Sequence, residues 1–282
     1  MPRIESLLGH YPRALHLADS LLPEKSKGLL RRLILGEKYP LEHPVSRELN
    51  GYDGKFWINN ASDWYRIVRE GFENDYAIEL LNSVKPGEVF LDVGSAQGFY
   101  SIFAAKAGAE VYAMDPDPVS VLSIDRNISL NQDVQNRIHV LNMGLGAKSG
   151  NMTMNIDPHG TYASSLRRTC RGLSTVINVE IKTADDLIAD DKMKPPDVVK
   201  IDVEGAEGLV LTGMKSLLTS YSRPAHLFME LHPLFLPQFG LSKDMVLQQI
   251  ADIGYVPNGA SYSHREKELY HFSPGRGNIF KG

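Results

Sequence analysis

Short apolar runs alternate with helical segments from about residue 75 onward. Each run has the length and composition of a buried strand, and a stretch with helical periodicity follows it. Repeated strand–helix units of this kind form a parallel sheet with right-handed crossovers and helices on both faces. The predicted strands are 88–93, 110–114, 138–142, 197–201 and 225–231, and the predicted helices are 75–84, 99–107, 118–131, 205–219 and 242–253. The sequence therefore predicts a Rossmann-like α/β domain, in which a ligand binds beyond the carboxyl ends of the strands.

Two parts of the chain depart from this alternation. The stretch between the third and fourth predicted strands is irregular and predicts antiparallel strands at 151–155 and 177–182, and the C-terminal tail predicts one or two more strands. Residues 1–50 contain two short helical patterns, at 4–22 and 25–35. We expect an N-terminal helical extension over 1–50, which packs on the main domain or contacts a membrane surface or another subunit. The remaining residues, 51–282, are expected to form one domain.

The charge and the cysteine content limit the partners of the chain. Its 282 residues carry a formal net charge of −4, so it has no overall basic field and we expect no nucleic-acid partner. Cys170 is the only cysteine, which excludes an internal disulfide and a thiolate metal cluster and fits a reducing compartment. The sequence has no signal-peptide core and no run of 18 or more apolar residues. We therefore expect a cytoplasmic protein without a transmembrane segment, and a homo-oligomer remains open.

A glycine-flanked loop follows the first predicted strand. Gly94 and Gly98 lack side chains, so the backbone of this turn can approach a ligand closely. The G-x-G-x-x-G pattern of a dinucleotide site is not met, because Ala96 and Phe99 stand where its further glycines belong. Asp92 ends the strand instead. A carboxylate there repels a pyrophosphate, but it can organise the loop and attract the ammonium of S-adenosylmethionine (SAM).

A second acid ends the next predicted strand. Asp115 lies 23 residues beyond Asp92, where a carboxylate can accept hydrogen bonds from both hydroxyls of a ribose. The alternative is that Asp115 is only a turn residue of the sequence Asp-Pro-Asp-Pro. The combination of the loop with this acid favours SAM binding.

Four segments resemble the FkbM family of class I methyltransferases: LDVGSAQGFYS (91–101), MDP (114–116), NMGLGAKSG (142–150) and, most specifically, KIDVEGAEGLVLTGM (200–214). The resemblance covers about residues 50–235, including the upstream stretch DGKFWINN and Glu73. It implies a class I methyltransferase fold, with a seven-stranded, mostly parallel sheet that has helices on both faces and one antiparallel strand. It also implies methyl transfer from SAM, commonly to a hydroxyl oxygen of a sugar or a natural-product scaffold. One departure is Ser95-Ala96-Gln97, where family members often carry Ala-Asn-Ile, although both flanking glycines remain.

The loop, the second strand end and the segments of the resemblance together define the candidate SAM-binding residues. These are Glu73, Asp92, Gly94, Ser95, Gln97, Gly98, Tyr100, Asp115 and Gly144.

Acidic residues and a histidine end the fourth and fifth predicted strands. Neighbouring strand ends would bring Asp202, Glu204, Glu230 and His232 to one edge of the cleft. Methyl transfer to a hydroxyl requires loss of a proton, so Asp202 is the first candidate base or orienting group and His232 the second. Glu204 is a third candidate catalytic residue, although acids here, including Glu207, also stabilise a helix N-terminus. His232 has the alternative of capping a strand.

The carboxylates and the imidazole could also converge on a divalent metal ion, although the sequence shows no dedicated ligand spacing. The expected acceptor is a hydroxyl on a sugar or another small molecule. The stretch 159–171, with Arg167, Arg168 and Arg171, would cover the cleft and bind an anionic group, or would form only a solvated patch. Two other functions stay open. The first is a nicotinamide-dependent oxidoreductase, although this sequence lacks the further glycines of the G-x-G-x-x-G pattern. The second is a catalytically inactive binding protein with a methyltransferase fold.

Overall fold

The computed structural model describes residues 42–59, 61–69, 74–156, 175–259, 261–264 and 267–275. These residues fall into two compact units. The smaller unit holds the described residues up to Arg47 and from Lys55 to 69, and the larger holds 48–54 and all described residues from 74 onward. The helices predicted at 4–22 and 25–35 lie outside the described residues, as do Glu73 and the stretch 159–171.

The first described elements are a β-hairpin and two short helices. The hairpin pairs β1 (His43–Leu49) with β2 (Tyr52–Ile58), and α4 (Ala61–Trp64) and the π-helix η1 (Tyr65–Arg69) follow. Asn50 and Gly51 both have positive φ, 51° and 81°, which is the backbone of a tight hairpin turn and suits an Asn-Gly pair. The domain boundary expected between residues 50 and 51 therefore falls within this turn.

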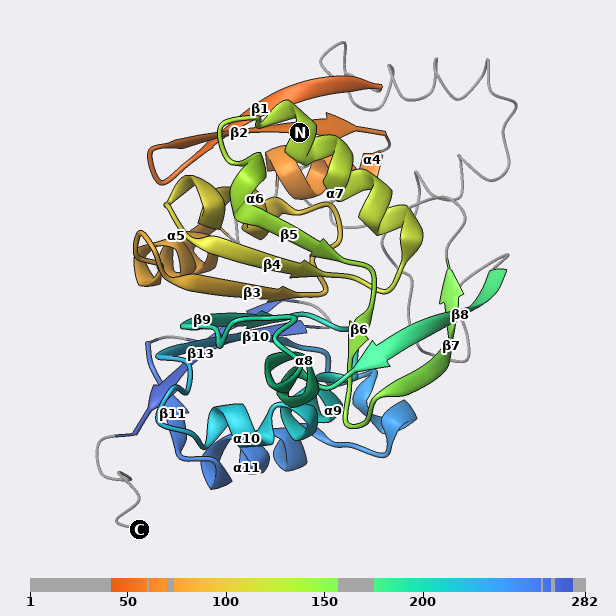
Figure 1. The fold of residues 1–282 in the computed structure, drawn as a ribbon, viewed down its shortest axis with the longest axis vertical. Helices are drawn as coiled ribbons and strands as arrows, with labels where there is room; N and C mark the ends of the chain where they lie inside the picture. Colours follow the sequence, from red (N-terminus) through yellow and green to blue (C-terminus); the bar gives the residue numbers. More distant parts are fainter. Residues whose placement is uncertain are drawn as a thin grey trace, which may run out of the picture. The chain divides into compact units, whose positions relative to one another are not determined.

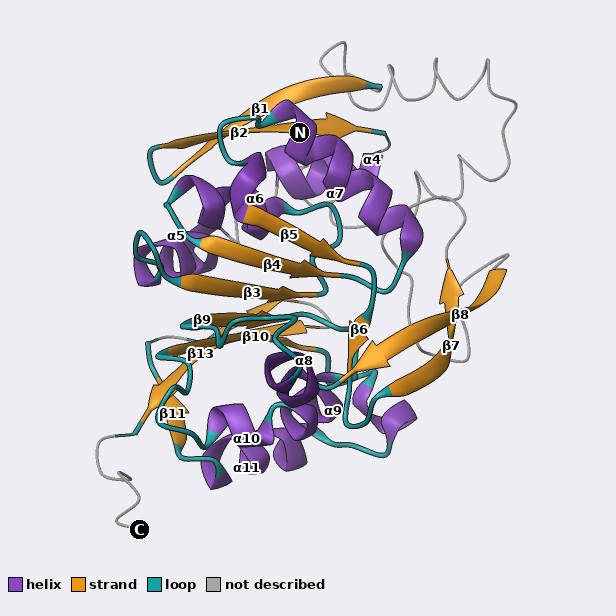
Figure 2. Cartoon of the chain, viewed as in Figure 1, coloured by secondary structure: helices purple, strands orange, loops and turns teal. Residues whose placement is uncertain are grey.

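The larger unit is built on a twisted sheet with the strand order β11-β13-β10-β9-β3-β4-β5 (Figure 2). All neighbouring pairs are parallel except those of β13, which runs antiparallel to both β10 and β11. The short β12 also pairs with β13. The bounds are β3 (Val89–Val93), β4 (Glu110–Met114), β5 (Ile138–Leu141), β9 (Val198–Ile201), β10 (His226–Leu231), β11 (Tyr255–Pro257), β12 (Tyr262–His264) and β13 (Lys267–Pro274). The predicted seven-stranded sheet with one antiparallel strand is confirmed.

Helices cover both faces of this sheet, as predicted. One layer contains α5, α6 and α7, and the other contains α8, α9, α10 and α11 (Figure 1). Every residue of β3 and β9 is buried, as expected for central parallel strands with both faces covered. The bounds are α5 (Asn74–Ser83), α6 (Phe99–Lys106), α7 (Pro118–Leu130), α8 (Ala184–Ala189), α9 (Glu207–Gly213), α10 (Lys215–Leu218) and α11 (Lys243–Asp252), with the 3-10 turns η2 (Gln135–Arg137) and η3 (Leu236–Phe239).

The single helix predicted over 205–219 is wrong in two respects. Glu204 and Gly205 have positive φ, 55° and 105°, so the chain cannot become helical before Glu207. The helix then breaks between Gly213 and Lys215. Glycine is a poor helix former, and a Cβ on Gly213 would lie 2.0 Å from the backbone oxygen of Gly146.

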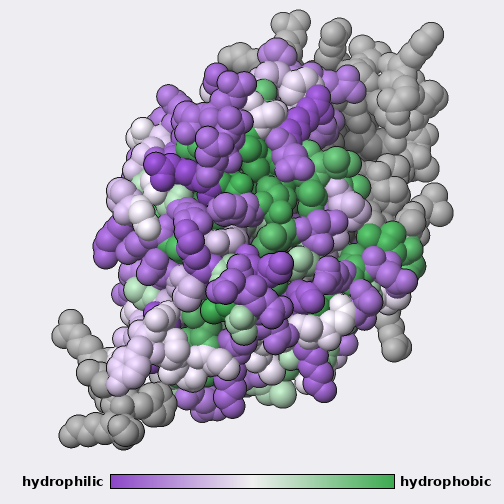
Figure 3. All heavy atoms as spheres, in the orientation of Figure 1, coloured by the Kyte–Doolittle hydropathy of each residue, from purple (hydrophilic) through white to green (hydrophobic). Residues whose placement is uncertain are grey.

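A three-stranded sheet with the order β6-β8-β7 lies between β5 and β9 in the chain. The predicted antiparallel pair is confirmed as β7 (Gly150–Ile156) and β8 (Thr175–Lys182), and the short β6 (Gly144–Leu145) joins β8 in parallel. Figure 3 shows a mostly hydrophilic face, with hydrophobic residues gathered near its centre and over this sheet, where Met152 and Val176 are exposed. Across the part of the chain that the structure describes, no helix combines the length and the apolar character needed to span a bilayer.

Candidate active site

The loop between β3 and α6 turns tightly across the end of β4. The backbone N–H groups of Gly94 and Ser95 both donate to the carbonyl oxygen of Met114, over 2.9 and 3.0 Å. Gly94, Ala96 and Gly98 all have left-handed backbones, with φ of 81°, 49° and 79°. The loop is therefore held by its own backbone conformation and by the neighbouring strand.

The two glycines of the loop are required by contacts within the protein. A Cβ on Gly94 would lie 1.8 Å from the backbone oxygen of Asp202, and a Cβ on Gly98 would lie 2.5 Å from the side chain of Ile124. In the sequence, these glycines indicate a turn that a ligand can approach closely. The structure adds a different reason, because the loop packs directly against the end of β9 and against α7.

Asp92 lies inside the protein. Its carboxylate accepts a 2.6 Å hydrogen bond from the Ser101 hydroxyl, and its other oxygen lies 3.7 Å from Nζ of Lys200. Burial raises the pKa of Asp92, and the Lys200 ammonium acts in the opposite direction. This geometry favours the loop-organising role of Asp92 over direct contact with a ligand ammonium.

Asp115 stands at the carboxyl end of β4, as predicted. One carboxylate oxygen accepts a 2.9 Å hydrogen bond from the N–H of Ala96, and the other accepts one of the same length from the N–H of Asp117. Burial raises the pKa of Asp115 to about 7, although these two backbone hydrogen bonds oppose the shift. Each carboxylate oxygen keeps a further lone pair for a ligand hydroxyl.

Two buried polar atoms of the loop have no hydrogen-bond partner among the described residues. They are Oγ of Ser95 and Oε1 of Gln97. The backbone of Gln97 is anchored, because its carbonyl oxygen accepts a 2.9 Å hydrogen bond from Nδ2 of Asn127 on α7. Unpaired buried polar atoms are costly in a folded protein, so they mark a place where a polar molecule completes the structure. The loop residues therefore fit a polar cofactor such as SAM.

The other candidate SAM-binding residues have different surroundings. The centroid of the Tyr100 ring lies 4.7 Å from Nζ of Lys200, and the ring so faces β9, the strand that carries Lys200. Gly144 is part of β6, where a Cβ would lie 2.8 Å from the end of the Ile181 side chain.

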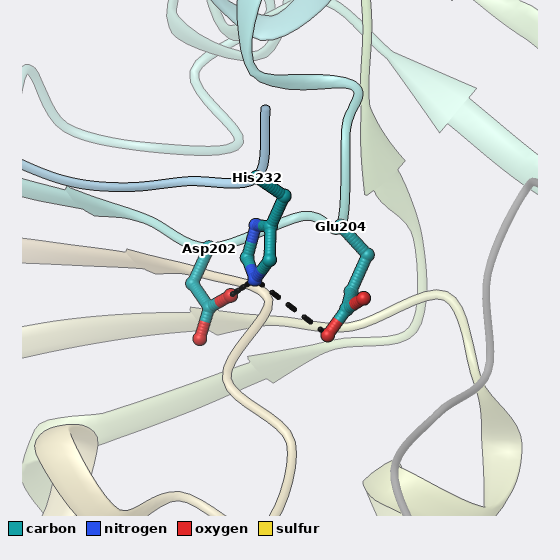
Figure 4. Close-up of side chains that lie close together, drawn as sticks. All are labelled: Asp202, Glu204 and His232. Atoms are coloured by element: carbon teal, nitrogen blue, oxygen red, sulfur yellow. Dashed lines mark ion pairs between the residues drawn. The ribbon is translucent and has the colours of Figure 1, made fainter. Parts of the chain in front are cut away.

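Three of the strand-end residues converge on one point (Figure 4). Nε2 of His232 lies 3.7 Å from Oε1 of Glu204 and 3.9 Å from Oδ1 of Asp202. Asp202 follows β9, His232 follows β10, and Glu204 reaches the same place because its left-handed backbone turns the chain. The predicted meeting of these side chains at the carboxyl ends of the strands is confirmed.

The imidazole of His232 is held from its far side. Its Nδ1 lies 2.8 Å from Oε1 of Glu207, the fully buried first residue of α9. The same oxygen accepts a 3.0 Å hydrogen bond from the N–H of Gly205, and the imidazole stacks on the Phe235 ring. Glu207 thus stabilises the start of its helix, as predicted, and also orients His232, which was not predicted.

Carboxylates control the protonation of His232. Burial by itself would lower the pKa of the imidazole, but its contacts with Glu207 and Glu230 and the charges of two further carboxylates raise it to about 11. The ring is therefore protonated at neutral pH, and a protonated imidazole has no lone pair to accept a proton. This argues against His232 as the alternative base.

A buried lysine connects the loop with the reaction centre. Nζ of Lys200 lies 3.4 Å from Oδ2 of Asp202 and 3.7 Å from Oδ1 of Asp92. Burial disfavours the charged ammonium, but the two carboxylates prevail and raise the pKa of Lys200. In the sequence, strand alternation predicts that Lys200 and Asp202 lie on the same side of the strand. It does not predict that Lys200 pairs with both carboxylates.

A second lysine was missed by sequence reasoning. Nζ of Lys267 lies 2.8 Å from Oε1 of Glu230, which in turn lies 3.3 Å from Nε2 of His232. Although burial opposes ionisation, the charges of Lys267 and His232 lower the pKa of Glu230. Lys267 begins the antiparallel β13, and no motif in the sequence links that tail to the strand ends.

A pocket of about 320 Å³ opens at the start of α9. It is lined by the turn between β6 and β7, which includes Lys148, by Asn151 of β7, and by Ala206 and Leu209 at the start of α9. Ala206 comes two residues after Glu204 in the chain. The volume suits a small molecule.

The sequence model described as the methyltransferase FkbM domain matches residues 92–257, more than half of the chain. The chain belongs to the FkbM methyltransferase family. It is therefore a methyltransferase, and SAM is the methyl donor. The family assignment agrees with the loop and the strand ends, and it favours methyl transfer over the nicotinamide-dependent and inactive alternatives.

Similar proteins support this assignment. Hexuronic acid methyltransferase AglP of Haloferax volcanii is 29% identical over 201 residues, which are 70% of this chain and 79% of AglP. The ribosomal protein L11 methyltransferase of Bacillus cytotoxicus is 50% identical over only 54 residues, 19% of this chain and 17% of that enzyme. The crystal structure of methyltransferase FkbM from Methylobacillus flagellatus shares the fold, with a TM-score of 0.50 and 16% identity. That match covers 95% of this chain and 60% of the solved one.

Proposed function

We propose that this FkbM-family methyltransferase transfers the methyl group of SAM to a hydroxyl oxygen of a sugar or of a similar small molecule. The observation that carries the proposal is the carboxylate-lined centre at the ends of β9 and β10. Oδ2 of Asp202 is directed to Lys200, so Oδ1 is the oxygen that faces this centre. The side chain of Asp202 is 22% exposed, so an acceptor can reach it.

Each group of residues has a distinct part in this proposal. SAM, when bound, supplies an electrophilic methyl group. Asp115 holds the ribose hydroxyls, and Ser95 and Gln97 offer their unpaired polar atoms to the same molecule. Asp202 orients the acceptor hydroxyl or accepts its proton at Oδ1, while Lys200 keeps that carboxylate in place.

The sugar assignment has two supports. Carboxylates accept hydrogen bonds from the hydroxyls of a polyol such as a sugar. AglP, which matches most of this chain, is named for action on a hexuronic acid.

The test uses SAM labelled with ¹³C in the methyl group. The protein is incubated with neutral hexoses, hexuronic acids and sugar nucleotides, and the products are analysed by NMR. We expect the labelled carbon to couple through an ether oxygen to a sugar ring carbon. A methyl ester of a sugar carboxylate would support a sugar acceptor but would refute methylation of a hydroxyl oxygen. A methyl group on nitrogen, carbon or a protein side chain would refute the proposal.

A further inference from the structure

Asp202, Glu204 and His232 present three donor atoms to one another. These atoms are two carboxylate oxygens and Nε2 of the imidazole, and all lie within 4.8 Å of one another. Figure 4 shows the three side chains directed inward from three separate positions of the backbone. Such a set combines one nitrogen and two oxygens, which are the ligand atoms of Mn²⁺ and related divalent ions.

The spacing suits a shared ion after a small adjustment. Donors that each lie about 2.1 Å from one ion are about 3.0–3.5 Å apart when they occupy adjacent positions. Nε2 of His232 is 3.7 Å from the Glu204 oxygen and 3.9 Å from the Asp202 oxygen. The three atoms lie within 4.8 Å of one another, so side-chain movements of about 1 Å would bring them into range, and Asp202 and Glu204 are only partly buried.

The imidazole provides an independent indication of a ligand. The His232 side chain is 5% exposed, yet its Nε2 comes no closer than 3.3 Å to any of the carboxylates around it, which is longer than a good hydrogen bond. The nearest of these oxygens, on Glu230, is already paired with Lys267 at 2.8 Å. Meanwhile Glu207 fixes Nδ1, as carboxylates behind metal-binding histidines do. The ring is thus held with Nε2 directed at the carboxylates, of which the Glu230 oxygen is the nearest at 3.3 Å.

The surrounding charge also favours a cation. Within the described residues, four carboxylates surround the imidazole: Asp202, Glu204, Glu207 and Glu230. Two ammonium groups face them, those of Lys200 and Lys267. A dication beside a neutral imidazole would balance the excess of negative charge. The ion would replace the proton on Nε2, which passes to solvent.

We propose that Asp202, Glu204 and His232 bind one divalent cation of the Mn²⁺ and Mg²⁺ class. The role of the ion rests on the proposed function: it binds the acceptor hydroxyl and makes it more acidic. The hydroxyl oxygen forms a bond to the methyl carbon, and the methyl–sulfur bond breaks with its electron pair going to sulfur. The hydroxyl proton passes to solvent, so Asp202 acts as an orienting ligand.

Binding of Mn²⁺ is measured without turnover, so its outcome is independent of the acceptor. Protein freed of metal with a chelator is titrated with MnCl₂, and free Mn²⁺ is followed by electron paramagnetic resonance. We expect one saturable site per chain, and affinity at least about tenfold weaker in Glu204→Gln. Asp190→Asn, which removes an exposed carboxylate at the end of α8, is the matched control and should bind as the wild type does.

Pulsed electron paramagnetic resonance on the complex of the wild-type protein with Mn²⁺ provides a test that needs no variant. Coordination by His232 should give a ¹⁴N coupling to the bound Mn²⁺, and His232→Gln should remove it. Thermal unfolding of each variant checks that it folds. The proposal fails if the wild type binds no Mn²⁺ at a saturable site, if Glu204→Gln binds as tightly as the wild type, or if the complex shows no nitrogen coupling.

Discussion

The backbone oxygen of Asp202 occupies the space that a side chain on Gly94 would need, because a Cβ there would lie only 1.8 Å away. Gly94 begins the loop after β3, and Asp202 follows the neighbouring β9. The residues assigned to SAM and those assigned to the acceptor are therefore in direct backbone contact. A change on one side of this contact must displace the other.

Gly94→Ala tests this contact. We expect loss of detectable SAM binding and a stability decrease of about 1–3 kcal/mol, because the β-carbon must push the end of β9 away. Calorimetry measures binding, and urea unfolding measures stability. Gly87→Ala is the matched control: it has a similar φ of 85° but no atom within 4 Å of its added carbon. If both variants bind SAM equally well, the contact does not determine the site.

Asp115→Ala tests the proposed ribose contact. Loss of charged hydrogen bonds should weaken SAM binding by about 1.5–3 kcal/mol without unfolding the protein. Asp125→Ala, an exposed acid on α7, should leave affinity unchanged. Isothermal calorimetry on the folded variants distinguishes them, and wild-type affinity in Asp115→Ala would remove this residue from the site.

The pH dependence of binding follows from the raised pKa of Asp115, about 7. Ribose hydroxyls donate to the ionised form, so SAM affinity should rise between pH 6 and 8, and the rise should be smaller in Asp115→Asn. Stability changes in the opposite direction. Since the folded pKa lies above the unfolded value of 3.8, the unfolded chain binds fewer protons between about pH 4 and 7. The contribution of Asp115 to the free energy of unfolding therefore falls as pH rises through that window. A wild-type affinity that is flat across pH 6–8 would contradict the assignment.

Asp202→Asn separates chemistry from cofactor binding. The amide preserves size but neither accepts a proton nor binds a cation as a carboxylate does, so turnover should fall by about 10²–10⁴-fold. SAM affinity should change little, because the Asp202 backbone oxygen that faces Gly94 is retained. Single-turnover assays with labelled SAM measure the first effect and calorimetry the second. Unchanged turnover would mean that positioning alone drives the reaction.

Lys200→Met should destabilise the protein by about 3–5 kcal/mol, because Asp92 and Asp202 lose the ammonium they share. Adding Asp92→Asn should recover part of that loss, as a double-mutant comparison by urea unfolding would show. Lys194→Met is the control, since its ion pair with Glu110 is largely exposed and should contribute little to stability. Equal losses of stability in the two lysine variants would show that the buried ion pairs of Lys200 contribute no more than the exposed ion pair of Lys194.

Sequence periodicity was sufficient to predict the parallel strands of the large sheet. Strand bounds such as 110–114 and 138–142 agree with β4 and β5 to within a residue, because buried strands in such folds are short, continuous apolar runs. The hairpin of β1 and β2 was missed, although its Asn50-Gly51 turn is a recognisable signal. The close approach of the Gly146 carbonyl group, which leaves no room for a side chain at position 213, could not be foreseen, since Gly146 lies far away in the chain.

The candidate site was predictable in outline only. The order of the strands implied that Asp202 and His232 would meet, since both follow adjacent parallel strands. The state of each group was not predictable. Asp92 resembles a ligand contact in the sequence and is buried against Ser101, and His232 resembles a neutral base and is protonated among carboxylates. Such properties depend on partners from distant segments, of which Lys267 is the clearest example.

The contact between Glu207 and His232 links the orientation of the imidazole to the interface between α9 and α11. Glu207 begins α9, and the next residue, Gly208, faces Gln249 and Val246 of α11, where a Cβ would lie 2.9 and 3.3 Å from their side chains. Mutations on α11 that tilt α9 would rotate the imidazole without altering any residue near a ligand. Natural selection for activity would therefore also act on this interface. We expect the residues at positions 208, 246 and 249 to change together among members of the family.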